Sequence, residues 1–154
     1  MPVKIGLRIF AAQFGPLNSI SQLKTQDLSF GQKASAVMEL TKARLNMSVV
    51  YSALAGYFLG ADSVSFSSII MLAIGGYLVV GAANGFNQVI ERHRDALMER
   101  TKNRPLPTGR LSANEAMLSS SVMAIIGLLL LYYINPLTVG FGAFALFVYV
   151  LVYT

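Results

Sequence analysis

The residues best suited to chemistry form an acidic stripe with an amide at its head. Asn87, Glu91 and Asp95 recur at intervals of four residues. On a helix this spacing places the three side chains along one face, each about 6 Å further along the axis. The stripe offers hard oxygen ligands, and Mg²⁺ prefers a few carboxylates together with water and substrate phosphates. The spacing therefore predicts that these three residues bind Mg²⁺ and form the catalytic centre.

A basic cluster follows the stripe directly. Its side chains suit the oxygens of a diphosphate, and its members are Arg100, Lys102, Arg104 and Arg110. Lys42 and Arg44, ahead of the first apolar segment, are further candidates for the phosphate; the alternative is that they anchor the chain at a membrane boundary. Metal ligands beside phosphate ligands at a membrane surface indicate a lipid substrate with a diphosphate head.

A purely structural interpretation of the same segment is a helix whose acids pair with neighbouring bases. The position of Asn87 favours the functional interpretation, because this residue lies at the end of an uncharged, apolar run. A polar group at membrane depth is costly and therefore suggests a use.

Three uncharged stretches supply the elements that must position these side chains. Of the 154 residues, 55% are hydrophobic and only 12% are charged. No charge occurs between Arg44 and Asp62, between Asp62 and Glu91, or from residue 116 to the end. Each stretch can cross a hydrocarbon core of about 30 Å at roughly 1.5 Å per residue. The last is about twice as long, so the sequence predicts an all-α polytopic transmembrane bundle with four helices, at about 45–60, 67–86, 117–134 and 137–153.

Local signals mark the ends of these spans. Ser112 and Glu115 form a capping box ahead of the third span. Asn135 and Pro136 divide the last stretch and supply an N-cap and a first-turn proline for the fourth span. Two glycine pairs allow close approach of helix backbones in lipid and so predict a packed bundle: Gly56/Gly60 and Gly81/Gly85.

The basic residues set the expected orientation. All 12 Lys and Arg lie before the first span or between the second and third, which is the positive-inside pattern of membrane proteins. We therefore expect the N-terminus and the 88–115 loop in the cytoplasm, and no nucleic-acid binding despite the net charge of +5. Residues 1–38 are interpreted as a basic cytoplasmic tail with at most a short surface helix at 5–14. Cysteine is absent, which excludes disulfides and cysteine metal sites.

The segment 84–112 resembles the first signature of the UbiA superfamily of intramembrane prenyltransferases, Asn-x-x-x-Asp-x-x-x-Asp. Within the superfamily it is most similar to the heme farnesyltransferase family. Glu91 stands where most of the superfamily has Asp, and Ala43 stands where the family commonly has Pro. The residues that carry the similarity are Asn87-Gln88, Glu91, Asp95, Met98, the run from Arg100 to Leu106, and Gly109.

The resemblance implies about nine helices around a central cavity, of which residues 39–154 would be roughly the first half, so the chain is expected to be truncated. It implies transfer of a farnesyl group from farnesyl diphosphate to a vinyl group of heme b, giving heme O and diphosphate. Mg²⁺ would be the cofactor, the bacterial cell membrane the location, and heme A synthase or oxidase assembly factors possible partners. Without a second polar signature, the 154 residues alone are expected to be inactive.

Two other functions stay open. One is a prenyltransferase for an aromatic quinone or chlorophyll precursor, against which Met98 ahead of Arg100-Thr101 argues. The other is a non-enzymatic four-helix membrane subunit or assembly factor. His93, the sole histidine, suggests an axial heme ligand, but an exposed histidine beside a loop is more often a solvated helix residue.

The charge pattern yields a prediction about topology. A reporter fused after Gly109 should read as cytoplasmic, and one fused within residues 62–65 as external, because basic loops resist translocation. Paired alkaline phosphatase and fluorescent-protein fusions measure this directly. The opposite readings would overturn the orientation and the side of the membrane on which the stripe lies.

Overall fold

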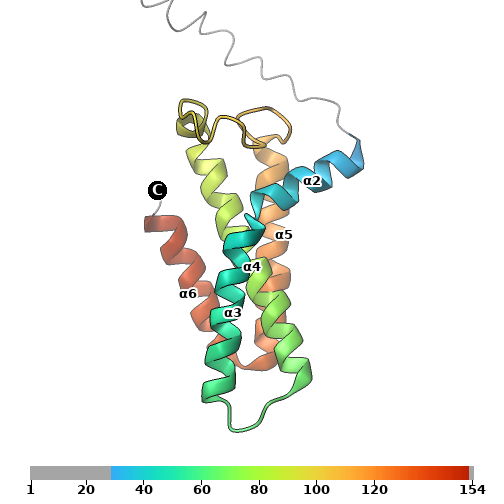
Figure 1. Cartoon of the computed structure of the whole chain (residues 1–154), viewed down its shortest axis with the longest axis vertical. Coiled ribbons are helices and arrows are strands. Elements are labelled where there is room, and N and C mark those ends of the chain that lie inside the picture. Colours follow the sequence, from blue (N-terminus) through green and yellow to red (C-terminus); the bar gives the residue numbers. More distant parts are fainter. Residues whose placement is uncertain (1–28, 153–154) are drawn as a thin grey trace, which may run out of the picture.

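The computed structural model describes residues 29–152, which fold into five α-helices (Figure 1). The short helix that the sequence suggests at 5–14 lies outside these residues. In Figure 1, the four longer helices run alongside one another, and the first described helix crosses the end of the bundle that carries the 96–112 loop. The helices are α2 (Phe30–Leu40), α3 (Ala43–Gly60), α4 (Phe66–Asp95), α5 (Ala113–Ile134) and α6 (Pro136–Val152).

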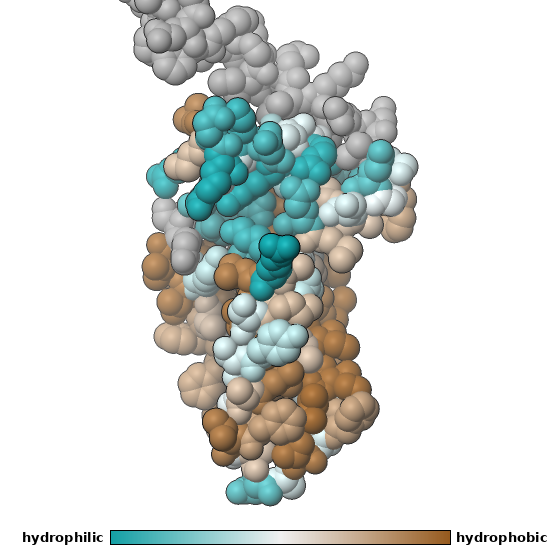
Figure 2. All heavy atoms as spheres, in the orientation of Figure 1, coloured by the Kyte–Doolittle hydropathy of each residue, from teal (hydrophilic) through white to brown (hydrophobic). Residues whose placement is uncertain are grey.

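Helices α4 and α5 have the length and hydropathy to cross a membrane, and α6 is a shorter apolar helix of 17 residues. Only 28% of the apolar window of α4 and 22% of that of α5 are buried. The core helix of a soluble protein would be mostly buried, so this exposure of apolar side chains is typical of membrane-spanning helices. Figure 2 shows hydrophobic residues along the bundle and hydrophilic ones gathered at the end with the loop. The prediction of an all-α membrane bundle is confirmed.

Helix α4 is longer than the span expected at 67–86. Its 30 residues make a rod of about 45 Å at 1.5 Å per residue, against a hydrocarbon core of about 30 Å. The apolar span and the polar segment that ends at Asp95 are therefore one continuous helix. This continuity carries the acidic stripe out of the membrane without a hinge.

The helix ends follow the predicted local chemistry. The Ser112 hydroxyl accepts a hydrogen bond from the Glu115 amide, and the Glu115 carboxylate accepts one from the Ser112 amide, which completes the capping box. At the start of α6 the Asn135 side chain accepts from the Leu137 amide at 2.8 Å. Pro136 occupies the first helical position, where its missing N–H has no consequence.

Close packing of α4 on α5 is the most extensive contact of the bundle. A Cβ on Gly127 would lie 2.9 Å from the carbonyl oxygen of Gly75, and one on Gly85 would lie 2.0 Å from the Ser120 hydroxyl. The expected pair Gly81/Gly85 does face neighbours: Gly81 faces Thr41 in the turn before α3 and Asn46 in α3, and Gly85 faces Ser120 in α5. By contrast, Gly56 and Gly60 have nothing within 4 Å.

Helix α2 lies in the stretch interpreted from the sequence as a tail. Its N-terminus is capped by Gln32, whose side chain accepts from the Ser29 amide at 3.0 Å. Its apolar face, Ala36 and Leu40, is buried in a cluster that α4, the loop and α5 complete with Val89, Leu106, Leu111 and Ala116. A helix of 11 residues is marginal alone, so α2 depends on this packing.

The α4–α5 contact yields a prediction. Gly127→Ala should lower stability by about 1–3 kcal/mol, because the added methyl group meets backbone atoms that cannot move aside. Gly76→Ala is the matched control, since a Cβ there meets nothing within 4 Å, and it should be neutral or slightly stabilising. Thermal unfolding followed by circular dichroism in detergent compares the two variants. Equal midpoints would contradict the packing described here.

Candidate functional site

The acidic stripe occupies the last turns of α4. Asn87 and Asp95 are each 3% exposed, and Glu91 is half-buried between them. The Asn87 amide nitrogen donates to a Glu91 carboxylate oxygen at 3.1 Å. The structure thus brings the first two predicted residues into direct contact on one face of the helix.

These three side chains can supply oxygen ligands to a metal ion. The Asn87 side-chain oxygen is buried and has no hydrogen-bond partner among the described residues, and an unpaired buried acceptor is costly. A cation would satisfy it. The described part of the chain holds no cluster of three or more His, Asp or Glu that could bind a metal. Two carboxylates and one amide fit Mg²⁺, which fills its remaining positions with water and phosphate.

Arg104 from the loop is paired with Asp95. Its guanidinium donates to a carboxylate oxygen of Asp95 at 2.6 Å, and the carboxylate is 5% exposed. The Thr101 hydroxyl donates to the backbone carbonyl of Asp95 at 2.9 Å, so the loop folds back onto the end of α4. One predicted phosphate ligand therefore lies directly against one predicted metal ligand.

Lys42 reaches the same place from the turn between α2 and α3. Among the described residues other than glycine, only Lys42 has a positive φ, at 51°, a conformation that costs roughly 1–2 kcal/mol. Burial lowers the pKa of its ammonium group, and the nearby Arg104 lowers it further, followed more weakly by Arg100. The acids Asp95 and Glu91 raise the same pKa. Both acids of the stripe thus act electrostatically on the half-buried Lys42.

The other predicted phosphate ligands have different surroundings. Lys102 pairs with Glu99 at 2.6 Å on the exposed surface. Arg110 donates to both carboxylate oxygens of Glu39, at 2.8 and 3.1 Å, and so joins the loop to α2. Arg44 is exposed in the first turn of α3. Of the predicted phosphate ligands, Arg104 pairs directly with the stripe, and the half-buried Lys42 is influenced electrostatically by Asp95 and Glu91.

His93 lies exposed near the end of α4, where its ring nitrogen accepts a hydrogen bond from Arg92 at 3.2 Å. Within residues 29–152, neither Glu91 nor Asp95 forms a hydrogen bond or ion pair with it. This environment is that of a solvated helix residue.

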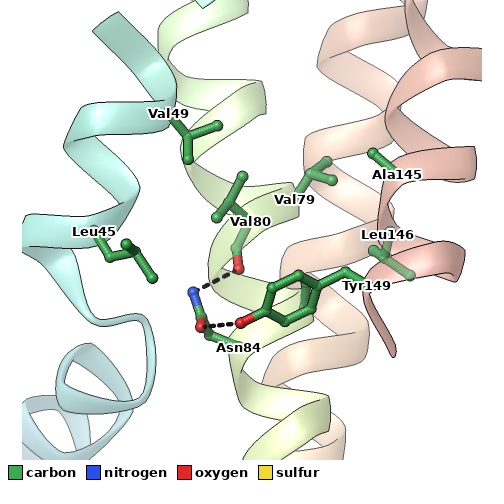
Figure 3. A pocket seen from close by; sticks show the side chains of 9 residues that line it. Leu45, Val49, Val79, Val80, Asn84, Ala145, Leu146 and Tyr149 are labelled. Atoms are coloured by element: carbon green, nitrogen blue, oxygen red, sulfur yellow. Dashed lines mark hydrogen bonds between the residues drawn. The ribbon is translucent and has the colours of Figure 1, made fainter. Parts of the chain in front are cut away.

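The family resemblance predicts a central cavity, but sequence reasoning identified none of the residues that line the apolar cavity beside the stripe. It measures about 350 Å³ and lies between α3, α4 and α6 (Figure 3). Apolar side chains line it except at Asn84, whose oxygen accepts from the Tyr149 hydroxyl at 3.1 Å. Asn84 lies one helical turn before Asn87. A buried asparagine within an uncharged span is a signal readable from sequence, whereas its partner 65 residues away is not.

The bundle and its polar end define a helical integral membrane protein with an oxygen-rich cluster of side chains at the end of α4. Residues 49–154 match the model of the UbiA prenyltransferase family. The matched segment is more than half of the chain, so this protein belongs to the UbiA prenyltransferase family.

Three relatives carry the same descriptive name, protoheme IX farnesyltransferase. The chain is 58% identical to that of Christiangramia forsetii over 116 residues, 75% of this chain and 39% of the relative. It is 53% identical to that of Flavobacterium psychrophilum (75% and 40%) and 41% identical to that of Leptospira biflexa (75% and 42%). The chain thus spans about 40% of the length of the curated relatives it matches. No solved structure matches it.

Two ion pairs of equal length provide a test of the site. Arg104→Met should destabilise the protein by about 2 kcal/mol or more, because it leaves the Asp95 carboxylate buried and unpaired. Lys102→Met breaks the exposed pair with Glu99 and should cost less than about 0.5 kcal/mol. Thermal unfolding in detergent at neutral pH measures both. Similar losses in the two variants would argue against a buried pair at Asp95.

Proposed function

We propose that the complete gene product is a protoheme IX farnesyltransferase. It transfers a farnesyl group from farnesyl diphosphate to a vinyl group of heme b and releases diphosphate. The observation that carries the proposal is the ion pair of Arg104 with Asp95 at the oxygen-rich stripe of α4, beside an apolar cavity. The choice of heme b as the acceptor of the farnesyl group is based on the names of the relatives.

The stripe and the cations bind different parts of the diphosphate head. Asn87, Glu91 and Asp95 are the ligands that would hold Mg²⁺. The chemistry that Mg²⁺ supplies at such ligands is Lewis-acid neutralisation of charge on a leaving diphosphate. Lys42, Arg100 and Arg104 bind the remaining oxygens, as fixed cations aimed at the charge that develops when the bond to the farnesyl group breaks.

The apolar cavity accommodates the farnesyl chain. Its walls come from three helices, and Asn84 joins it to the stripe one turn away on α4. When the carbon–oxygen bond breaks, the diphosphate keeps the electron pair and an allylic cation remains. Apolar walls keep water from that cation. The vinyl group of the heme then attacks it, and water quenches the cation that results.

The proposal includes the location. The protein would lie in the bacterial inner membrane with the N-terminus and the 88–115 loop in the cytoplasm, where both substrates are available. Heme A synthase or oxidase assembly factors are the proposed protein partners, because heme O must pass to a further modification or insertion step.

The test is formation of heme O by the complete gene product. Expressed in cells that lack their own enzyme, it should yield heme O in a heme extract. Asp95→Asn should lower this yield by about 100-fold or more, because it removes an anionic ligand at nearly constant shape. Glu99→Gln, a matched change in an exposed carboxylate four residues further along the chain, should leave the yield unchanged.

Two outcomes would reject the proposal or its site. Absence of heme O from the unaltered protein, despite its presence in the membrane, would reject the acceptor. A prenylated quinone precursor in the same extract would then identify the competing activity. Normal heme O from Asp95→Asn would remove that carboxylate from the site.

A further inference from the structure

The C-terminal end of α2 is held by side chains of α4. The Gln88 amide nitrogen donates to the carbonyl oxygen of Leu40 at 2.9 Å, and the Asn84 amide nitrogen donates to that of Thr41 at 3.4 Å. The last carbonyls of a helix have no partner within it. Gln88 and Asn84, one turn apart on the same face of α4, therefore cap α2 from outside.

The two capped carbonyls immediately precede Lys42. The Thr41 side chain is fixed as well, since its hydroxyl donates to the Met38 carbonyl at 2.7 Å and lies 3.0 Å from the Tyr77 hydroxyl. Several hydrogen bonds thus attach the backbone and side chain before Lys42 to α4. This attachment holds Lys42 in its left-handed conformation, with φ at 51°.

Burial of the side-chain amides of Gln88 and Asn84 costs free energy. Gln88 is 2% exposed and Asn84 1% exposed, and burial of an amide costs free energy unless its hydrogen bonds are made. The Gln88 side-chain oxygen has no partner among the described residues. An apolar side chain of the same size would fill the space without that cost. The hydrogen bond to the end of α2 is what Gln88 provides instead.

The same helix carries the stripe. Gln88 lies one residue after Asn87 and three before Glu91, so α4 sets the distance between Lys42 and the acidic side chains through a short, rigid connection. A lysine side chain is flexible, and fixing its backbone reduces the freedom lost when its ammonium group binds an anion.

We propose that Gln88 and Asn84 are positioning residues, which hold the turn at Lys42 so that its ammonium group meets the diphosphate of the prenyl substrate. The inference rests on the proposed function, because it takes the substrate head to be a diphosphate. It predicts that loss of the Gln88 cap weakens binding of the head and leaves binding of the apolar chain unchanged.

The experiment compares two inhibitors of heme O formation by the complete gene product. Inorganic diphosphate probes the head site, and farnesol probes the chain site. Gln88→Met, which keeps the volume and removes the donor, should raise the inhibition constant of diphosphate about tenfold or more, as expected for one charge-assisted contact. The constant for farnesol should change by less than about twofold. Ser120→Ala, which removes a buried hydroxyl with no partner among the described residues, is the control and should change neither.

A double variant separates positioning from general support. If Gln88 acts through Lys42, Gln88→Met combined with Lys42→Ala should bind diphosphate no more weakly than Lys42→Ala alone. The inference would be overturned if the two substitutions multiplied their effects on the inhibition constant of diphosphate. It would also be overturned if Gln88→Met weakened diphosphate and farnesol binding equally. Gln88→Leu, which also removes the donor, repeats the test should Gln88→Met fail to accumulate in the membrane. Lack of heme O from the unaltered protein would instead reject the proposed function, so the two failures are distinguishable.

Discussion

Polar side chains inside an apolar bundle must find hydrogen-bond partners, and this constraint determines how the rest of the structure surrounds α4. Gln88 finds its partner in Leu40, the last residue of α2, and Asn84 finds partners in Thr41 of the following turn and in Asn46 of α3. Asp95 finds its partner in the loop through Arg104. Tyr149 brings α6 to the same face. The partners come from every other part of the bundle except α5, which packs on the opposite, glycine-rich side of α4. The arrangement of the helices thus follows from one helix having two kinds of face.

Much of this fold can be predicted from the sequence because its signals are local. The length of an uncharged run shows directly whether it can cross a membrane. The capping residues Ser112 and Asn135 bond to residues only a few positions away. The acidic stripe is equally local, since a spacing of four residues defines a face once the segment is helical. These features need no knowledge of what lies elsewhere in the chain.

The features that sequence reasoning missed depend on contacts between distant residues. Helix α2 has only 11 residues and is stabilised by side chains from α4, the loop and α5. Arg110 belongs by type and position to a phosphate-binding cluster, but its partner Glu39 lies 71 residues away. The apolar cavity is formed where three helices meet. In each case the deciding interaction joins elements whose relative position the sequence does not encode locally.

The charges at the polar end have a consequence for binding under the proposed function. Arg104 compensates the Asp95 carboxylate, while Lys42 is partly buried beside both. A metal ion arriving alone would add positive charge to a place that already holds these cations. A diphosphate arriving alone would meet the acids of the stripe. Arriving together, they bring opposite charges that each satisfy one half of the site, so binding of either strengthens binding of the other. A stripe of acids and a set of cations held side by side on α4 and its neighbours is therefore suited to a metal–diphosphate complex better than to either component.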